Sequence, residues 1–216
     1  MRPSLRHPFD NLTTEQRDQL TAYREQVLRF NRRINLVSRD TAAQFEDRHV
    51  RHALTLAYKA FPAGSRVVDW GTGGGLPAVP LAIYFPDVTF YAVDAVEKKI
   101  QCVRMMARRL GLQNLHPWHG RAEAWPGTAR YSVSRATAPL LDLWRWHTRS
   151  REAVLQEGVA DQWQPGLICL KGGDLREEIN ALQQQYPTVR VETIRLDTLL
   201  EPPYFVNKVI LEVWEA

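Results

Sequence analysis

Residues 67–77 read Val-Val-Asp-Trp-Gly-Thr-Gly-Gly-Gly-Leu-Pro, an apolar run that ends in a cluster of glycines followed by a proline. Because glycine lacks a Cβ and tolerates positive φ, this cluster predicts a sharp turn that a ligand can approach closely. Pro77 suits the first turn of a helix, where its missing N–H would have no partner. Leu76 stands where a dinucleotide-binding fingerprint has its third glycine, which argues against a nicotinamide dinucleotide as the ligand.

Short β-branched runs alternate with helical stretches from residue 62 onward, which is typical of βαβ units around a parallel sheet. Helices are predicted at residues 77–84, 97–110, 139–157 and 175–186, of which 139–157 is either one helix or a broken one. Strands are predicted at residues 66–70, 89–93, 115–119, 131–134, 167–170, 189–195 and 208–214. The last two strands have no helix between them, so they can pair only as a hairpin and the final strand is antiparallel to the rest. The sequence thus predicts an α/β fold with a doubly wound, seven-stranded, mostly parallel, Rossmann-like sheet.

Two helices are predicted before the first strand. Thr13-Thr14-Glu15-Gln16 has the spacing of a capping box. Apolar residues then recur at steps of three and four, at positions 20, 23, 27, 30 and 34, while the opposite face carries arginines at positions 17, 24, 29, 32 and 33. A second helix is predicted at residues 41–59. We therefore expect residues 1–60 to form an N-terminal helical extension and residues 61–216 to form one compact domain.

The charged residues are unevenly distributed along the 216-residue chain, whose formal net charge is +4. Residues 1–59 contain 11 Lys and Arg against 7 Asp and Glu, and residues 95–151 contain 11 against 3, whereas residues 152–216 contain 5 against 11. This asymmetry favours a polyanion bound on one face, since phosphate contacts supply most sequence-independent affinity for nucleic acid. Solvated helix faces would give the same pattern, so charge alone leaves both interpretations open.

The composition excludes several classes of protein. Hydrophobic residues make up 44% and charged residues 24%, which is typical of a folded globular chain rather than a disordered one. The sequence has no run of about 18 apolar residues and no apolar leader, so we expect a cytoplasmic protein without a membrane contact. We also expect a monomer, although no sequence pattern fixes the oligomeric state. The two cysteines, Cys102 and Cys169, are too few and too far apart for a disulfide framework or a cysteine-based zinc site.

The histidines and tryptophans are assigned to structural roles. His49 and His52 are three residues apart, but no carboxylate-rich pattern accompanies them, so we interpret them as exposed helix residues and predict no metal site. We expect at least four of five tryptophans to serve in packing, at positions 118, 125, 144, 146 and 163.

Candidate ligand-binding residues follow three of the predicted strands. Asp94 comes nineteen residues after Gly75, at the end of the second strand, where a carboxylate can accept the ribose hydroxyl protons of an adenosine-containing ligand. Gly120-Arg121-Ala122-Glu123 follows the third strand and offers backbone N–H groups and a carboxylate to an adenine ring. Arg135 follows the fourth strand, at the edge where a doubly wound sheet opens its crevice, and can hold an anion there.

Several segments together resemble the RsmG (GidB) family, which are class I S-adenosylmethionine-dependent methyltransferases that modify N7 of a guanine in the 530 loop of bacterial 16S rRNA. The resemblance spans most of the chain. The segments are Asn-Arg-Arg-Ile-Asn-Leu-Val-Ser at 31–38, Arg51-His52, the Gly-Thr-Gly-x-Gly-Leu-Pro region at 69–83, Asp94, Lys98-Lys99, Arg121-Ala122-Glu123, Ser134-Arg135-Ala136 and Lys171-Gly172.

The resemblance implies S-adenosyl-L-methionine as the cofactor, and 16S rRNA, the 30S subunit or an assembly intermediate as the partner. It implies a cofactor pocket formed by Gly71, Gly73, Gly75, Leu76, Asp94, Ala122, Glu123 and Arg135. It also implies that Arg135, His52 and Lys171 form the catalytic site and meet the RNA or the target base.

The residues favour N7 methylation over other base methylations. Guanine N7 has a free lone pair, so no general base is required, and the sequence shows no catalytic triad or paired carboxylates. A cytosine-C5 enzyme needs a nucleophilic cysteine, but both cysteines fall in apolar elements. The Glu-Pro-Pro-Tyr at 201–204 imitates an adenine-amino motif but falls in the turn between the last two strands. A small-molecule methyltransferase and a non-catalytic cofactor- or RNA-binding regulator remain open alternatives, because fold alone does not fix the substrate.

Overall fold

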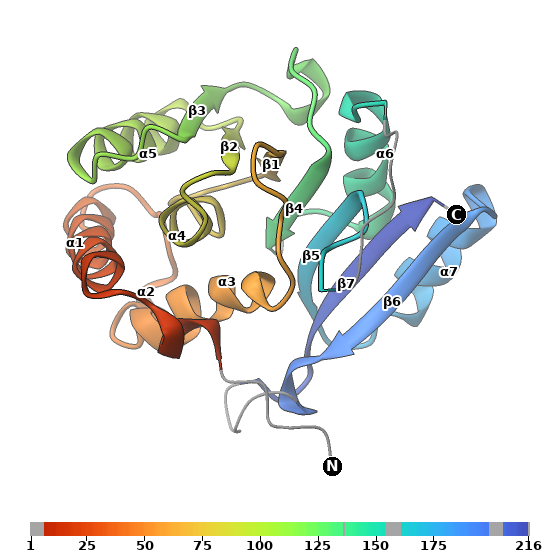
Figure 1. The fold of residues 1–216 in the computed structure, drawn as a ribbon, viewed down its shortest axis with the longest axis horizontal. Helices are drawn as coiled ribbons and strands as arrows, with labels where there is room; N and C mark the ends of the chain where they lie inside the picture. Colours follow the sequence, from red (N-terminus) through yellow and green to blue (C-terminus); the bar gives the residue numbers. More distant parts are fainter. Residues whose placement is uncertain (1–6, 136, 154–160, 199–204, 216) are drawn as a thin grey trace.

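The computed structural model describes residues 7–135, 137–153, 161–198 and 205–215. One seven-stranded sheet forms its centre, in the order β3-β2-β1-β4-β5-β7-β6 (Figure 1). The strands are β1 Arg66–Trp70, β2 Thr89–Asp94, β3 Leu115–His119, β4 Tyr131–Arg135, β5 Gly166–Gly172, β6 Val189–Arg195 and β7 Lys208–Glu215. All seven predicted strands are confirmed, with ends that shift by at most two residues.

The topology of the sheet confirms the doubly wound fold. Strands β1 to β5 pair in parallel, whereas β7 is antiparallel to β5 on one side and to β6 on the other. The chain therefore runs from β1 outward to β3, returns to β4 beside β1, and ends in the predicted hairpin with β7 inserted between β5 and β6. The strand order reverses between β1 and β4, and in open α/β sheets ligands bind in the crevice at the carboxyl ends of the strands at such a point.

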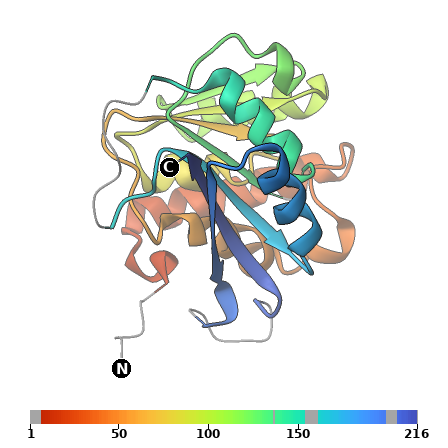
Figure 2. The same ribbon diagram turned by 90° about the vertical axis from the view of Figure 1, so that its right-hand side faces the viewer.

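Alternate residues of each strand feed two hydrophobic cores on opposite faces of the sheet. Val67 belongs to the core that is shared with α4 Ala78–Tyr84 and α5 Glu97–Arg109. Val68 belongs to the core that is shared with α6 Leu140–Ser150 and α7 Arg176–Gln185. In Figure 2, α6 and α7 face the viewer and the N-terminal helices lie behind the sheet. This alternation follows from the two-residue period of a strand buried on both faces.

The helix predicted at 139–157 is shorter than expected. α6 ends at Ser150, and Arg151 is extended and forms a bridge with Ala129. Ser150 Oγ donates to Trp146 O at 2.8 Å, so the side chain bonds a carbonyl of the last helical turn. Residues 154–157 of the predicted helix lie outside the described residues, as do Ala136 and the Glu-Pro-Pro-Tyr at 201–204.

The first N-terminal helix forms as predicted, and the second does not. α1 Thr14–Asn31 begins with the predicted capping box, in which Thr13 and Gln16 bond reciprocally. The region of the second helix instead contains α2 Arg39–Ala42, a π-helical turn at Glu46–Arg51, α3 His52–Leu54 and a 3₁₀ turn at Thr55–Ala57. Thr55 Oγ1 donates to the carbonyl of His52 at 2.7 Å, which competes with the regular backbone pattern. Such π-helical turns often occur at functional sites.

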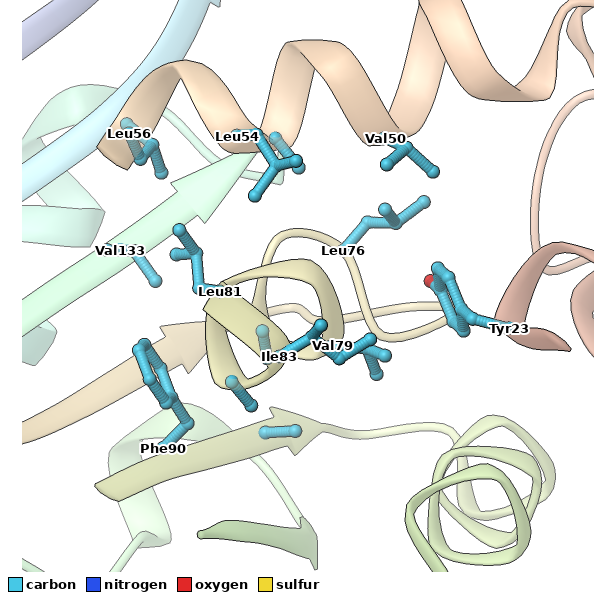
Figure 3. Packing of buried hydrophobic residues seen from close by; sticks show 14 of the residues in the cluster. Tyr23, Val50, Leu54, Leu56, Leu76, Val79, Leu81, Ile83, Phe90 and Val133 are labelled. Atoms are coloured by element: carbon cyan, nitrogen blue, oxygen red, sulfur yellow. The ribbon is translucent and has the colours of Figure 1, made fainter. Parts of the chain in front are cut away.

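The hydrophobic core crosses from the N-terminal helices to the glycine turn. Tyr23, Val50, Leu76 and Leu81 are buried and belong to one cluster (Figure 3). The N-terminal segments therefore contribute directly to the face of the sheet that supports α4. None of the helices in the described part of the chain combines the length and the apolar character needed to cross a membrane.

Candidate functional site

The glycine turn after β1 adopts backbone conformations that other residues rarely reach. Gly71, Gly73 and Gly75 have φ values of 72°, 57° and 92°. A Cβ at Gly71 would overlap the side chain of Thr137, and a Cβ at Gly75 would overlap Val79 in α4. Glycine at position 71 thus allows close approach at the mouth of the crevice, whereas glycine at position 75 allows the turn to pack on its helix.

Asp94, at the end of β2, holds this turn in place. Its Oδ2 accepts a hydrogen bond from the backbone N–H of Gly73 at 2.9 Å, and its Oδ1 accepts one from Val96 at 2.8 Å. The residue is only 8% exposed. Each carboxylate oxygen has a second lone pair, so Asp94 is anchored and still has acceptor capacity for a ligand.

A cavity of about 460 Å³, which we call the glycine-turn cavity, opens over these two elements. Its volume is in the range of small-molecule and cofactor sites. It brings together seven of the predicted cofactor residues, namely Gly71, Gly73, Leu76, Asp94, Ala122, Glu123 and Arg135. Gly75, the eighth, is not among its lining residues, because that position packs against α4.

Trp146 of α6 also lines this cavity, whereas the sequence pattern predicts packing roles for at least four of the five tryptophans and singles out none of them for the cofactor. Its indole Nε1 donates to Glu123 Oε1 at 3.0 Å, and its ring packs edge-on against Trp70, with the centroids 6.2 Å apart. Nothing in the local pattern shows which face of α6 meets the crevice. Three further lining residues, Leu36, Lys99 and Thr137, were likewise not predicted to contact the cofactor.

A second cavity of about 360 Å³ lies next to the first, and we call it the acceptor cavity. It brings together His52, Arg135 and Lys171, the three predicted catalytic residues. Arg135 and Thr137 line both cavities. Lys208 of β7 also lines the acceptor cavity. No sequence pattern points to Lys208, because only the pairing of β7 with β5 places it beside Gly172.

The polar groups of the acceptor cavity are fixed by their partners. Lys171 Nζ donates to Ala138 O at 2.7 Å and to Glu178 Oε2 at 2.8 Å. Glu178 Oε2 also accepts from the backbone N–H of Leu140 at 2.7 Å, at the start of α6. The ammonium group of Lys171 is therefore held beside the carboxyl end of β5 by α6 and α7 together.

The histidines near this cavity are buried, so the expectation that His49 and His52 are exposed is wrong. They are 7% and 5% exposed, because the π-helical turn packs this segment against the sheet. Burial lowers the pKa of His52 to about 3, and the charges of Arg135 and Lys208 act in the same direction. His52 is thus a neutral imidazole at physiological pH.

A third cavity of about 660 Å³ lies beside the glycine-turn cavity, and we call it the basic groove. It shares Leu36 and Lys99 with the glycine-turn cavity. Its other lining residues are Asn31, Arg32, Arg33, Asn35, Val37 and Ser38. The Asn31 side chain holds the loop, because its Oδ1 accepts from the backbone N–H groups of Leu36 and Val37 at 2.8 and 3.0 Å.

One buried carboxyl group, that of Asp69, joins β1 to the start of α4 beneath the glycine turn. Asp69 of β1 is fully buried, and its Oδ2 accepts from the backbone N–H of Ala78 at 3.1 Å, at the start of α4. Burial raises the pKa of Asp69 to about 7. Within the described residues, no group of three or more His, Cys, Asp or Glu side chains is arranged to hold a metal ion.

This sheet order, with a glycine turn after β1 and an acidic residue at the end of β2 facing one cavity, defines a class I S-adenosylmethionine-dependent methyltransferase. The chain belongs to the GidB family, rRNA small subunit methyltransferase G, which matches residues 16–203.

Two relatives carry the name of this family, and a solved structure shares the fold. Ribosomal RNA small subunit methyltransferase G of Salinibacter ruber is 54% identical over 207 residues, which cover 95% of this chain and 96% of that protein. The protein of the same name from Bacteroides fragilis is 42% identical over 171 residues, which cover 79% of this chain and 81% of that protein. Fibrillarin of Aeropyrum pernix, solved with natively bound S-adenosyl-L-methionine, superimposes with a TM-score of 0.53 at 14% identity, over 76% of this chain and 73% of that chain, and shows the shared fold.

Proposed function

We propose that this protein transfers a methyl group from S-adenosylmethionine to N7 of a guanine in the 530 loop of 16S rRNA. The observation that carries the proposal is the position of Arg135, which lines both the glycine-turn cavity and the acceptor cavity. A group that borders both cavities can contact cofactor and acceptor at once, which is what a direct transfer between two bound molecules requires.

The glycine-turn cavity fits S-adenosylmethionine. A Cβ at Gly71 would intrude on its edge, and the anchored carboxylate of Asp94 has lone pairs for the ribose hydroxyl groups. Leu76 and Ala122 supply apolar surface, and Glu123 supplies an acceptor for an adenine amino group. We therefore assign the cofactor to Gly71, Gly73, Leu76, Asp94, Ala122, Glu123 and Arg135, and we assign Gly75 to support of the turn.

The acceptor cavity supplies N–H donors, and methylation of guanine N7 needs no general base. When bound, S-adenosylmethionine would supply an electrophilic methyl group. The lone pair of guanine N7 would form the new C–N bond as the bond between the methyl group and the sulfonium breaks, and S-adenosylhomocysteine would leave as a neutral thioether. The chain then has to orient the base and exclude water, which contributes through proximity and alignment. Arg135 and Lys171 present N–H groups of the kind that bind guanine O6, and the buried, neutral His52 forms part of the wall beside them.

The basic groove is the proposed contact for the RNA backbone. Arg32, Arg33 and Lys99 line it, and Leu36 and Lys99 connect it to the cofactor. Arg29, one turn earlier on α1, is exposed and extends the same basic surface. We propose that a monomer binds 16S rRNA in the cytoplasm, as free RNA, as the 30S subunit or as an assembly intermediate.

Transfer of a labelled methyl group from S-adenosylmethionine tests the proposal. The acceptors are 30S subunits, free 16S rRNA and a pool of small molecules, and nucleoside analysis identifies the product. We expect label in 7-methylguanosine from a 530-loop fragment, and none with Arg135→Ala. Label only in a small molecule would favour a small-molecule methyltransferase, and cofactor binding without any transfer would favour a regulator.

A further inference from the structure

A residue outside both cavities holds Arg135 in place. Nη1 of Arg135 lies 2.9 Å from Nδ1 of His49, which belongs to the π-helical turn at Glu46–Arg51. The same Nη1 is 3.5 Å from the carbonyl oxygen of Arg48. His49 is not among the lining residues of the glycine-turn cavity or the acceptor cavity. Its contact with the site is therefore made through Arg135.

The chemistry of the two groups fixes the direction of this hydrogen bond. A guanidinium group has only donors, so Nδ1 of His49 must be the acceptor. Burial, together with the charges of Arg135 and Arg48, lowers the pKa of His49 to about 4. The ring is therefore neutral, and its single proton is on Nε2.

The proton on Nε2 continues the chain of hydrogen bonds toward the basic groove. Nε2 of His49 lies 2.8 Å from Oγ1 of Thr41, which accepts from it. The hydroxyl of Thr41 donates in turn to the carbonyl of Ser38 at 3.0 Å. Ser38 is one of the residues that line the basic groove. A directed chain thus runs from Arg135 through His49 and Thr41 to the loop that forms this groove.

Packing fixes the orientation of the imidazole ring. The ring of Phe45 lies against it, with the centroids 5.2 Å apart, and Phe45 itself packs edge-on against Tyr23 at 5.7 Å. Phe45 and Tyr23 are both fully buried. The ring therefore has an anchored neighbour on one face and a hydrogen bond at each nitrogen, an arrangement that locks the side chain of Arg135.

We propose that His49 is a positioning residue that sets the guanidinium of Arg135 at the boundary between cofactor and acceptor, and that links it through Thr41 to the basic groove. The proposal rests on the proposed function, since Arg135 matters here because both reactants meet beside it. The two proposals can fail separately. The wild-type protein tests whether 7-methylguanosine forms, and variants of His49 test how Arg135 is positioned.

Two substitutions of His49 distinguish a role in positioning Arg135 from a role in the stability of the fold. His49→Asn keeps an acceptor near the position of Nδ1, whereas His49→Phe keeps a ring against Phe45 and removes the acceptor. We expect His49→Phe to lower kcat for 16S rRNA at least about tenfold, with a KM for S-adenosylmethionine within about threefold of wild type, since small displacements of aligned groups slow the reaction strongly. We expect His49→Asn to recover part of that kcat, since it restores the acceptor for Arg135 but not the hydrogen bond to Thr41.

His147 provides a matched control. It is also a buried histidine, its pKa is lowered to about 3 mainly by burial, and its Nδ1 lies 2.9 Å from Oγ of Ser132, but it lines neither cavity. His147→Phe is expected to lower the melting temperature and leave kcat of the folded fraction unchanged. If His49→Phe behaved in the same way, His49 would be a structural residue only and the proposal would be wrong.

A double-mutant cycle between positions 41 and 49 tests the link to Thr41 even if His49→Phe folds poorly. Thr41→Val removes the acceptor for Nε2 and is expected to lower kcat several-fold in the wild-type background. The shorter side chain of His49→Asn no longer reaches Thr41, so Thr41→Val is expected to have no further effect on kcat in that background. Equal losses of kcat in both backgrounds would contradict the chain of hydrogen bonds.

Discussion

The hydroxyl of Tyr23 donates a 2.8 Å hydrogen bond to the carbonyl oxygen of Gly74, across 51 positions of sequence. Tyr23 lies in the middle of α1 and is fully buried, and Gly74 belongs to the turn that lines the glycine-turn cavity. The ring of Tyr23 lies in the same core as Leu76 and Val79 (Figure 3). The first helix of the chain therefore fixes the backbone of the glycine turn.

Removal of this hydroxyl tests the connection. Tyr23→Phe keeps the packing of the ring but leaves the Gly74 carbonyl without its donor, so we expect a decrease of about 1–3 kcal/mol in the free energy of unfolding. Because the turn then has more freedom, we also expect a weaker affinity for S-adenosylmethionine. Urea denaturation and isothermal titration calorimetry measure the two effects. Tyr84→Phe, on the partly exposed end of α4, is the control and should change neither.

Trp146 is expected to act on cofactor binding rather than on transfer. Trp146→Phe retains an aromatic ring beside Trp70 but removes the N–H that holds Glu123. We expect the KM for S-adenosylmethionine to rise several-fold while kcat stays within about twofold of wild type, because a freed Glu123 loses orientation and the reacting groups do not. Steady-state kinetics with saturating rRNA checks this. A fall in kcat at unchanged KM would show that Trp146 acts on the transfer step.

The contrast between Trp146 and Asp94 shows which residues of the candidate site could be predicted from the sequence. Asp94 and Arg135 are the last residues of β2 and β4, and the glycine turn and Glu123 lie in the loops after β1 and β3. Parallel strands bring their carboxyl ends to one edge, so the meeting of these residues in one cavity could be predicted. Trp146, Lys208 and His49 come to the site from a helix face, an antiparallel strand and a π-helical turn. Their placement depends on tertiary packing, for which a local pattern has no signal.

The fold also has elements that a local sequence pattern predicts and elements that depend on tertiary packing. Most strands of the sheet, such as β1 and β5, have strongly apolar patterns, and all seven were predicted to within two residues at each end. The region at 41–59 has an apolar pattern that fits a helix, but it has to wrap around the glycine turn with His49 and His52 inside. Long-range packing against Arg135 and the sheet decides its irregular path.

Asp69 is expected to make stability depend on pH. Between about pH 4 and pH 7 the native state keeps a proton on Asp69 that the unfolded chain has released, since burial raises the native pKa to about 7. The unfolded state then binds fewer protons, so the contribution of Asp69 to the free energy of unfolding falls as pH rises through this window. The change is on the order of 4 kcal/mol at most, because one pKa unit corresponds to about 1.4 kcal/mol.

Asp69→Asn isolates this effect, because asparagine stays neutral and keeps an acceptor for the backbone N–H of Ala78. We expect the stability of wild type relative to Asp69→Asn to decrease between pH 5 and pH 8. Urea denaturation at the two pH values measures it, and the exposed Asp87→Asn serves as control. A difference between wild type and Asp69→Asn that does not vary with pH would mean that Asp69 does not titrate in this window.

The basic groove is expected to bind RNA through charge, and its contribution should appear in the salt dependence. Each phosphate that a cationic side chain neutralises releases counterions, so the slope of log K against log salt becomes less steep by roughly 0.7–0.9 when one such side chain is removed. We expect Arg32→Ala, Arg33→Ala and Lys99→Ala each to reduce this slope for a 530-loop fragment, because the three side chains line one groove next to the glycine-turn cavity. Fluorescence anisotropy at several salt concentrations measures the slope.

Arg190→Ala removes an equal charge from the exposed edge strand β6, far along the sheet from the groove, and provides the control. It should leave the slope unchanged, which separates local contacts from the effect of net charge. The cofactor affinity of the Arg32 and Arg33 variants should also remain that of wild type, since neither side chain lines the glycine-turn cavity. If all four variants shifted the slope equally, RNA would be attracted by the overall field of the protein, and the groove would have no specific role in holding the RNA backbone.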